Sequence, residues 1–140
     1  MALAAASHVG RSLNRGNTVI PKWMIAVSGL ICVLGIFVGC SLYLSPGTFI
    51  KDVDFASAGT RYLANMWGAR QITLASILGF AALRRSVPML QLSLGAYALM
   101  NVQDAIIGVL RGDRGLIAGA TVFMLVPAYM VFRLARLERR

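Results

Sequence analysis

Hydrophobic residues along the chain fall into four long runs, separated by short polar or basic segments. The runs cover residues 23–44, 61–83, 88–110 and 115–136. At about 1.5 Å of rise per residue, a helix of this length crosses the hydrocarbon core of a bilayer, which is roughly 30 Å thick. The pattern predicts an all-α membrane fold, a bundle of four transmembrane helices that run alternately up and down.

Residues that break or begin helices lie between the runs. Pro46 and Gly47 follow the first run, and a mixed polar and apolar loop then leads to the second. Pro88 stands where the third helix begins, a position that proline favours. The basic turn before it is short, so the second and third helices should be antiparallel neighbours.

Composition supports a single membrane domain. Hydrophobic residues make up 58% of the chain and charged residues 14%, whereas soluble domains have roughly 25% charged residues. We expect a flexible basic tail over residues 1–22, a membrane domain over residues 23–136 and a short basic tail over residues 137–140.

The net charge of +9 does not indicate a nucleic-acid partner, because the basic residues gather at the ends of apolar runs. Four crossings place both termini on one side, with nine Lys and Arg residues there and four on the opposite side. The positive-inside rule then predicts cytoplasmic termini, and we expect a bacterial inner membrane. The nine are Arg11, Arg15, Lys22, Arg84, Arg85, Arg133, Arg136, Arg139 and Arg140.

The third run carries Asn101, Gln103 and Asp104 inside an otherwise apolar segment. A carboxylate in hydrocarbon is costly unless it is protonated or paired, and such residues usually mark functional sites. Arg70 is the expected partner of Asp104, because both lie roughly 21 to 24 Å along their helices from the turn between them. The two side chains should therefore meet nearer the outer side.

Other polar and aromatic residues share that depth, and we expect one outward-opening pocket. Three arginines should surround its mouth and favour an anionic group. The predicted pocket residues are Asn65, Trp67, Arg70, Gln71, Tyr97, Asn101 and Asp104, and the predicted mouth residues are Arg61, Arg111 and Arg114.

This arrangement has several interpretations. A structural one is an Arg70–Asp104 pair that fixes helix register. A second is a pocket for a lipid-like or quinone-like amphiphile. A third is a membrane enzyme in which Asp104 transfers a proton and Arg70 stabilises negative charge. A fourth is a small transporter subunit that oligomerises to enclose a path.

Small residues at four-residue spacing allow helices to approach closely. They occur as Gly35 with Gly39 and as Ala75 with Gly79. The same spacing suits either packing within one bundle or a homo-oligomer.

The sequence indicates no cofactor and no metal. His8 is the only histidine, and phosphate loops, dinucleotide fingerprints and zinc spacings are absent. Cys32 and Cys40 would lie roughly 12 Å apart along one helix, too far for a disulfide. The segment ending at Cys40 also resembles a lipoprotein processing box, but its apolar run is longer than a secretory signal.

Four stretches resemble small bacterial four-helix membrane proteins of the DoxX-like type. These are LYLSPGTF, RYLANMWGARQ, LGAYALMNVQD and DRGLIAGA. The resemblance covers residues 23–136 and implies a four-helix membrane fold. It also implies an arginine near the second helix and a polar or acidic residue in the third, which match Arg70 and Asp104 here. Some related proteins are linked to redox or sulfur metabolism, but this chain lacks a cofactor motif.

Overall fold

The computed structural model describes residues 20–48 and 53–138, which form four long α-helices and one 3₁₀ turn. The elements are α2 (Lys22–Leu44), η1 (Pro46–Thr48), α3 (Ala58–Leu83), α4 (Val87–Arg111) and α5 (Arg114–Glu138). Each observed helix end lies within three residues of its predicted position. No strand occurs within the described ranges.

Three of these helices, α2, α4 and α5, are long and apolar enough to cross a membrane. This finding indicates an integral membrane protein. Helix α3 has the length but is not among these three spans, because its first half carries most of its polar residues.

Local chemistry sets several helix ends. The Ser57 hydroxyl accepts a hydrogen bond from the Thr60 backbone N–H at 3.3 Å and caps α3. Pro88 lies in the first turn of α4 as predicted. Gly112 ends α4 with φ of 68°, a left-handed conformation that glycine adopts readily. The Asp113 carboxylate then accepts from the Leu116 N–H at 3.0 Å and caps α5.

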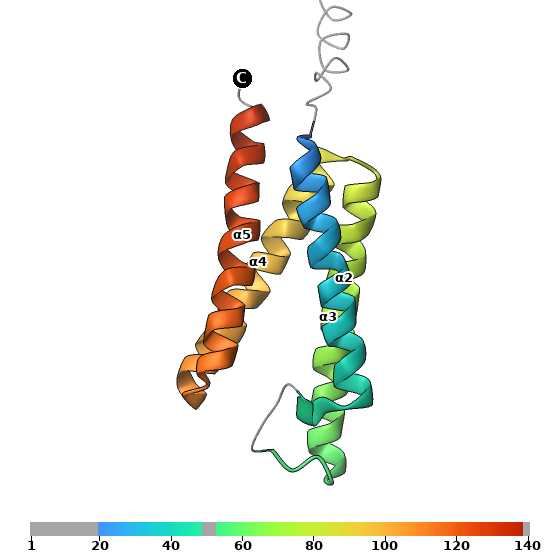
Figure 1. Cartoon of the computed structure of the whole chain (residues 1–140), viewed down its shortest axis with the longest axis vertical. Helices are drawn as coiled ribbons and strands as arrows, with labels where there is room; N and C mark the ends of the chain where they lie inside the picture. Colours follow the sequence, from blue (N-terminus) through green and yellow to red (C-terminus); the bar gives the residue numbers. More distant parts are fainter. Residues whose placement is uncertain (1–19, 49–52, 139–140) are drawn as a thin grey trace, which may run out of the picture.

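The helices form two antiparallel hairpins. Helix α2 packs along α3, α4 packs along α5, and a less extensive α3–α4 contact joins the two pairs. Figure 1 shows the hairpins close together near the α3–α4 turn and parted toward the opposite end. The predicted up-down order is present, but the helices do not pack as a uniform bundle along their whole length.

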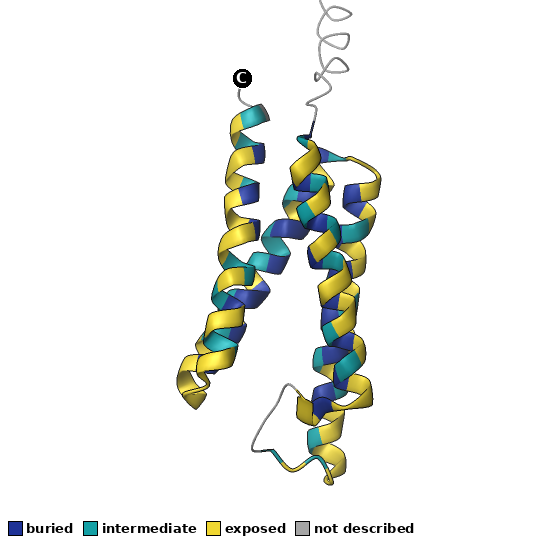
Figure 2. Cartoon of the chain, in the orientation of Figure 1, coloured by how far each residue is buried: buried dark blue, intermediate teal, exposed yellow. Residues whose placement is uncertain are grey.

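We call the half that holds the α3–α4 turn the inner half and the opposite half the outer half. All four helices contribute to one apolar core, and most of its residues lie in the inner half. Side chains that are almost completely buried there include Met24, Leu78, Leu90, Leu94, Met130 and Leu134. Figure 2 shows that burial follows the facing sides of the helices, whereas their outward sides are exposed.

Small residues allow α2 and α3 to pack closely, and this close packing continues into the outer half. A Cβ added at Gly39 would lie 2.9 Å from the Gly68 carbonyl oxygen, and one added at Gly35 would lie 2.8 Å from the Ala75 Cβ. Neither position has room for a larger side chain without movement of α3. Gly35 and Gly39 are therefore used for packing within the chain.

Parts of the predicted tails and loop lie outside the described residues, including residues 1–19, Lys51 and Asp52. Ile20 is buried in the core and Lys22 begins α2. The folded part therefore starts before residue 23, where the predicted membrane domain began.

Candidate functional site

An ion pair joins the two hairpins. The Arg70 Nη2 atom on α3 lies 2.7 Å from the Asp104 Oδ1 atom on α4. The Asp104 side chain is 6% exposed and the Arg70 side chain 38% exposed, so the carboxylate is enclosed while the guanidinium can be reached. This is the contact that equal depth along the two helices predicted.

A buried carboxylate needs such a partner. Two charges removed from water lose hydration, and a short charge-assisted hydrogen bond offsets part of that loss. Arg70 belongs to the polar part of α3, and Asp104 lies in the half of α4 that leads to Arg111. The pair therefore joins α3 to α4 outside the inner-half core.

Three polar atoms beside this pair are buried and make no hydrogen bond with described residues. They are Trp67 Nε1, Arg70 Nε and Gln71 Oε1. Their positions on α3 follow i, i+3 and i+4 spacing, so they share one face of the helix. Together they offer two N–H donors and one carbonyl acceptor.

Unsatisfied buried polar atoms are uncommon, because each loses about 1–3 kcal/mol of hydration without replacement. Three of them share one face of α3, and each has room in its hydrogen-bonding capacity for a water or for a polar group of a ligand. Gln71 is the most enclosed, with 7% exposure.

Two residues predicted as part of the pocket have other partners. The Asn101 amide donates to the Tyr97 carbonyl oxygen of its own helix at 2.8 Å. Tyr97 is 3% exposed and belongs to the apolar core, with its hydroxyl against Gly35 of α2. The Asn101 amide and the Tyr97 side chain therefore already have contacts within the folded chain, whereas the unpartnered atoms lie on α3.

The remaining predicted residues lie toward the outer end. Asn65 is half-buried on α3, two residues before Trp67. The three predicted mouth residues, Arg61, Arg111 and Arg114, are exposed, the first near the start of α3 and the others at the α4–α5 turn. Both of these segments lie at the lower end in Figure 1.

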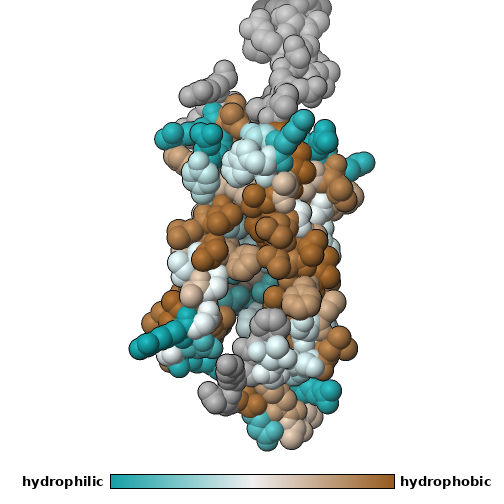
Figure 3. Space-filling view, in the orientation of Figure 1, coloured by the Kyte–Doolittle hydropathy of each residue, from teal (hydrophilic) through white to brown (hydrophobic). Residues whose placement is uncertain are grey.

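The molecular surface agrees with this layout. Figure 3 shows a hydrophobic middle zone between two more hydrophilic ends. In the lower half of that view, a notch lies between the two hairpins, with hydrophilic atoms at its upper end. A polar group could enter between the hairpins from this side.

Sequence reasoning missed one surface feature, an apolar groove between α4 and α5. Its lining consists almost entirely of ordinary aliphatic residues. Such residues carry no chemical signal in a membrane sequence, so only the packing of the two helices reveals it.

The chain was compared with family models, curated proteins and solved structures, and none of them matches it. The candidate site therefore rests on its own geometry.

Proposed function

We propose that this integral membrane protein binds the polar group of a lipid-like or quinone-like amphiphile between its two hairpins. The ligand's polar group would sit beside Arg70 and Asp104, and its apolar part would extend into the surrounding hydrocarbon. Binding, rather than a reaction, is the activity that the site supports best.

The observation that carries this proposal is the group of unpartnered buried atoms on α3. An oxygen acceptor on the ligand, such as a carbonyl or a head-group oxygen, suits the N–H groups of Trp67 and Arg70. A ligand hydroxyl suits Gln71 Oε1. A pair that only fixes helix register needs the Arg70–Asp104 contact but gives no use for these atoms.

The charge of the site favours a neutral or anionic polar group. The carboxylate of Asp104 is already paired with Arg70, and the three predicted mouth residues are exposed arginines. A cation would meet these arginines on approach, so a carbonyl or a phosphate is the better match.

We further propose that α3 is a fourth membrane span, because it packs along α2 over its length and its polar half faces the site. Four spans and the distribution of basic residues favour cytoplasmic termini in a bacterial inner membrane. The resemblance to DoxX-like proteins suggests the same layout, with Arg70 and Asp104 in matching positions.

Native mass spectrometry of the full chain, purified in a mild detergent, tests the binding proposal. Wild type should carry an amphiphile that Trp67→Phe retains less well, because this change removes the N–H donor and keeps an aromatic ring. One hydrogen bond corresponds to about threefold to tenfold weaker retention.

Trp23→Phe is the matched control, since Trp23 lies at the exposed start of α2. This variant should retain the amphiphile as wild type does. Wild-type protein free of any amphiphile, or equal retention by Trp67→Phe and Trp23→Phe, would contradict the proposal.

A further inference from the structure

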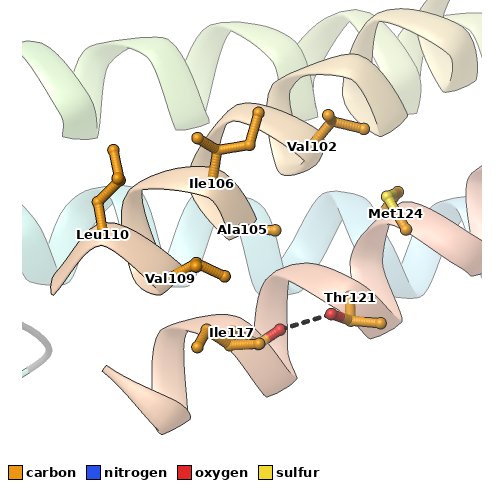
Figure 4. Close-up of a pocket in the computed structure, with 8 residues that line it drawn as sticks. All are labelled: Val102, Ala105, Ile106, Val109, Leu110, Ile117, Thr121 and Met124. Carbon is orange, nitrogen blue, oxygen red and sulfur yellow. Dashed lines mark hydrogen bonds between the residues drawn. The ribbon is translucent and has the colours of Figure 1, made fainter. Parts of the chain in front are cut away.

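An open groove of about 350 Å³ runs between α4 and α5 in the outer half. Figure 4 shows the side chains that line it, which come from both helices. They are Val102, Ala105, Ile106, Val109, Leu110, Ile117, Thr121 and Met124. The only hydroxyl among them, on Thr121, already donates to the Ile117 carbonyl oxygen at 2.7 Å. The groove therefore presents no free polar group to an occupant.

This groove is distinct from the site between the hairpins. On α4, Val102, Ile106 and Val109 lie on the side away from Asp104, because at 3.6 residues per turn each is about 140–160° around the helix from it. Ile106 is 55% exposed and Val109 65% exposed. In a helix that crosses a membrane, these side chains face the lipid.

The size and shape suit a single hydrocarbon chain. A protein cavity of about 150 Å³ holds benzene, so this groove has room for a longer segment. From Val102 to Leu110 it extends about 12 Å along α4 at 1.5 Å per residue. Its length runs parallel to the helices, as a lipid chain does.

Positive charge lies where the groove ends at the α4–α5 turn. Arg114, Ile117, Thr121 and Met124 follow i, i+3, i+7 and i+10 spacing, so the arginine is on the same face of α5 as the lining residues. Arg111 ends α4 in the same turn. Neither arginine forms an ion pair with a described residue, whereas the Asp113 carboxylate between them caps α5.

We propose that this groove binds one acyl chain of an anionic phospholipid, with the lipid phosphate against Arg114 and Arg111. The apolar lining holds the chain, and the basic turn selects the head group. A basic residue near a membrane surface contributes about 1 kcal/mol to the attraction of anionic lipid, so Arg114 accounts for about fivefold in affinity.

The test is native mass spectrometry of the full chain, titrated with phosphatidylglycerol or with phosphatidylcholine of the same acyl chains. Wild type should bind phosphatidylglycerol about fivefold or more tightly than phosphatidylcholine. Arg114→Gln should reduce this preference by about fivefold, whereas Arg133→Gln, which changes an exposed arginine at the opposite end of α5, should leave it unchanged.

Filling the groove tests the acyl-chain part. Ala105→Phe and, independently, Met124→Phe should each weaken binding of both lipids, since either ring occupies the groove from one wall. Leu92→Phe, on an exposed part of α4 outside the groove, is the control.

Equal affinity of wild type for the two lipids would overturn the head-group assignment, as would equal effects of Arg114→Gln and Arg133→Gln. Unchanged binding by whichever groove variants remain folded would overturn the acyl-chain assignment. A result in which Trp67→Phe loses its amphiphile while these lipid preferences persist would separate this groove from the site between the hairpins.

Discussion

The inner and outer halves of the molecule are held together in different ways. In the inner half, four helices meet around buried apolar side chains such as Leu78, Leu94 and Met130. In the outer half, the hairpins part, and the ion pair of Arg70 with Asp104 joins α3 to α4. Apolar packing holds the helices together in the inner half, and an ion pair connects α3 to α4 in the outer half.

The inner half therefore contributes mainly to stability, whereas the outer half carries the polar groups of the candidate site. A core of packed aliphatic side chains offers no polar group to a ligand. It holds the inner ends of the two hairpins against each other. The outer half can then keep a carboxylate, a guanidinium and unpartnered N–H groups at a defined spacing. The inner core is therefore the support on which the outer site is built.

Removing the guanidinium should have the largest effect on stability. Arg70→Ala leaves the Asp104 carboxylate, which is 6% exposed, without its partner, and an uncompensated buried charge costs about 3–5 kcal/mol. We expect a lower free energy of unfolding for the full chain in detergent. A loss below about 1 kcal/mol would mean that the pair contributes little to holding α3 and α4 together.

Truncating the inner core should cost somewhat less. Leu94→Ala leaves a cavity where four helices meet, which corresponds to about 2–5 kcal/mol. Leu92→Ala is the control, because Leu92 lies two residues away on α4 and is 77% exposed. Equal melting temperatures of the two variants would argue against a continuous inner core.

Enlarging a glycine inside the α2–α3 hairpin should cost about 1–3 kcal/mol. Gly39→Val places side-chain atoms against the Gly68 backbone, which cannot move without displacing α3. Gly29→Val on the same helix meets no atom within 4 Å and shares the same change in helix propensity. Thermal melts should separate the two variants, and identical melts would be incompatible with close α2–α3 packing at Gly39.

The smallest effect comes from unpartnered polar side chains, one in each half. Ser28 lies fully buried in α2, where its hydroxyl makes no hydrogen bond with the described residues, and Gln71 lies one residue after Arg70. Ser28→Ala and Gln71→Met should each leave stability unchanged or raise it by up to about 1 kcal/mol. Only Gln71→Met should reduce retention of the co-purified amphiphile. Equal retention by both variants would remove Gln71 from the proposed site.

Much of this architecture can be predicted from the sequence. Apolar runs, and residues between them such as Pro46 and Pro88, mark the helices, since an α-helix satisfies its backbone hydrogen bonds within its own segment in lipid. The Arg70–Asp104 contact follows from the number of residues between each side chain and the α3–α4 turn. Similar numbers place residues of two antiparallel helices at the same depth.

Rotation of a helix about its own axis is harder to predict. Tyr97 lies seven residues before Asp104, on the same side of α4, and was expected to form part of the pocket, yet it packs in the core against Gly35. A stripe shows which residues lie together but not which neighbour they face. That choice depends on where the partner helix has a glycine, and on how far the hairpins separate.

The most direct test of the account is a double-mutant cycle on the ion pair, using Arg70→Gln, Asp104→Asn and both together. We expect the double variant to recover much of the stability lost by either single change, with a coupling free energy of about 1–3 kcal/mol. The measurement is reversible unfolding of the full chain in detergent. Strictly additive losses would show that the two side chains do not depend on each other, and would contradict the proposed link between the hairpins.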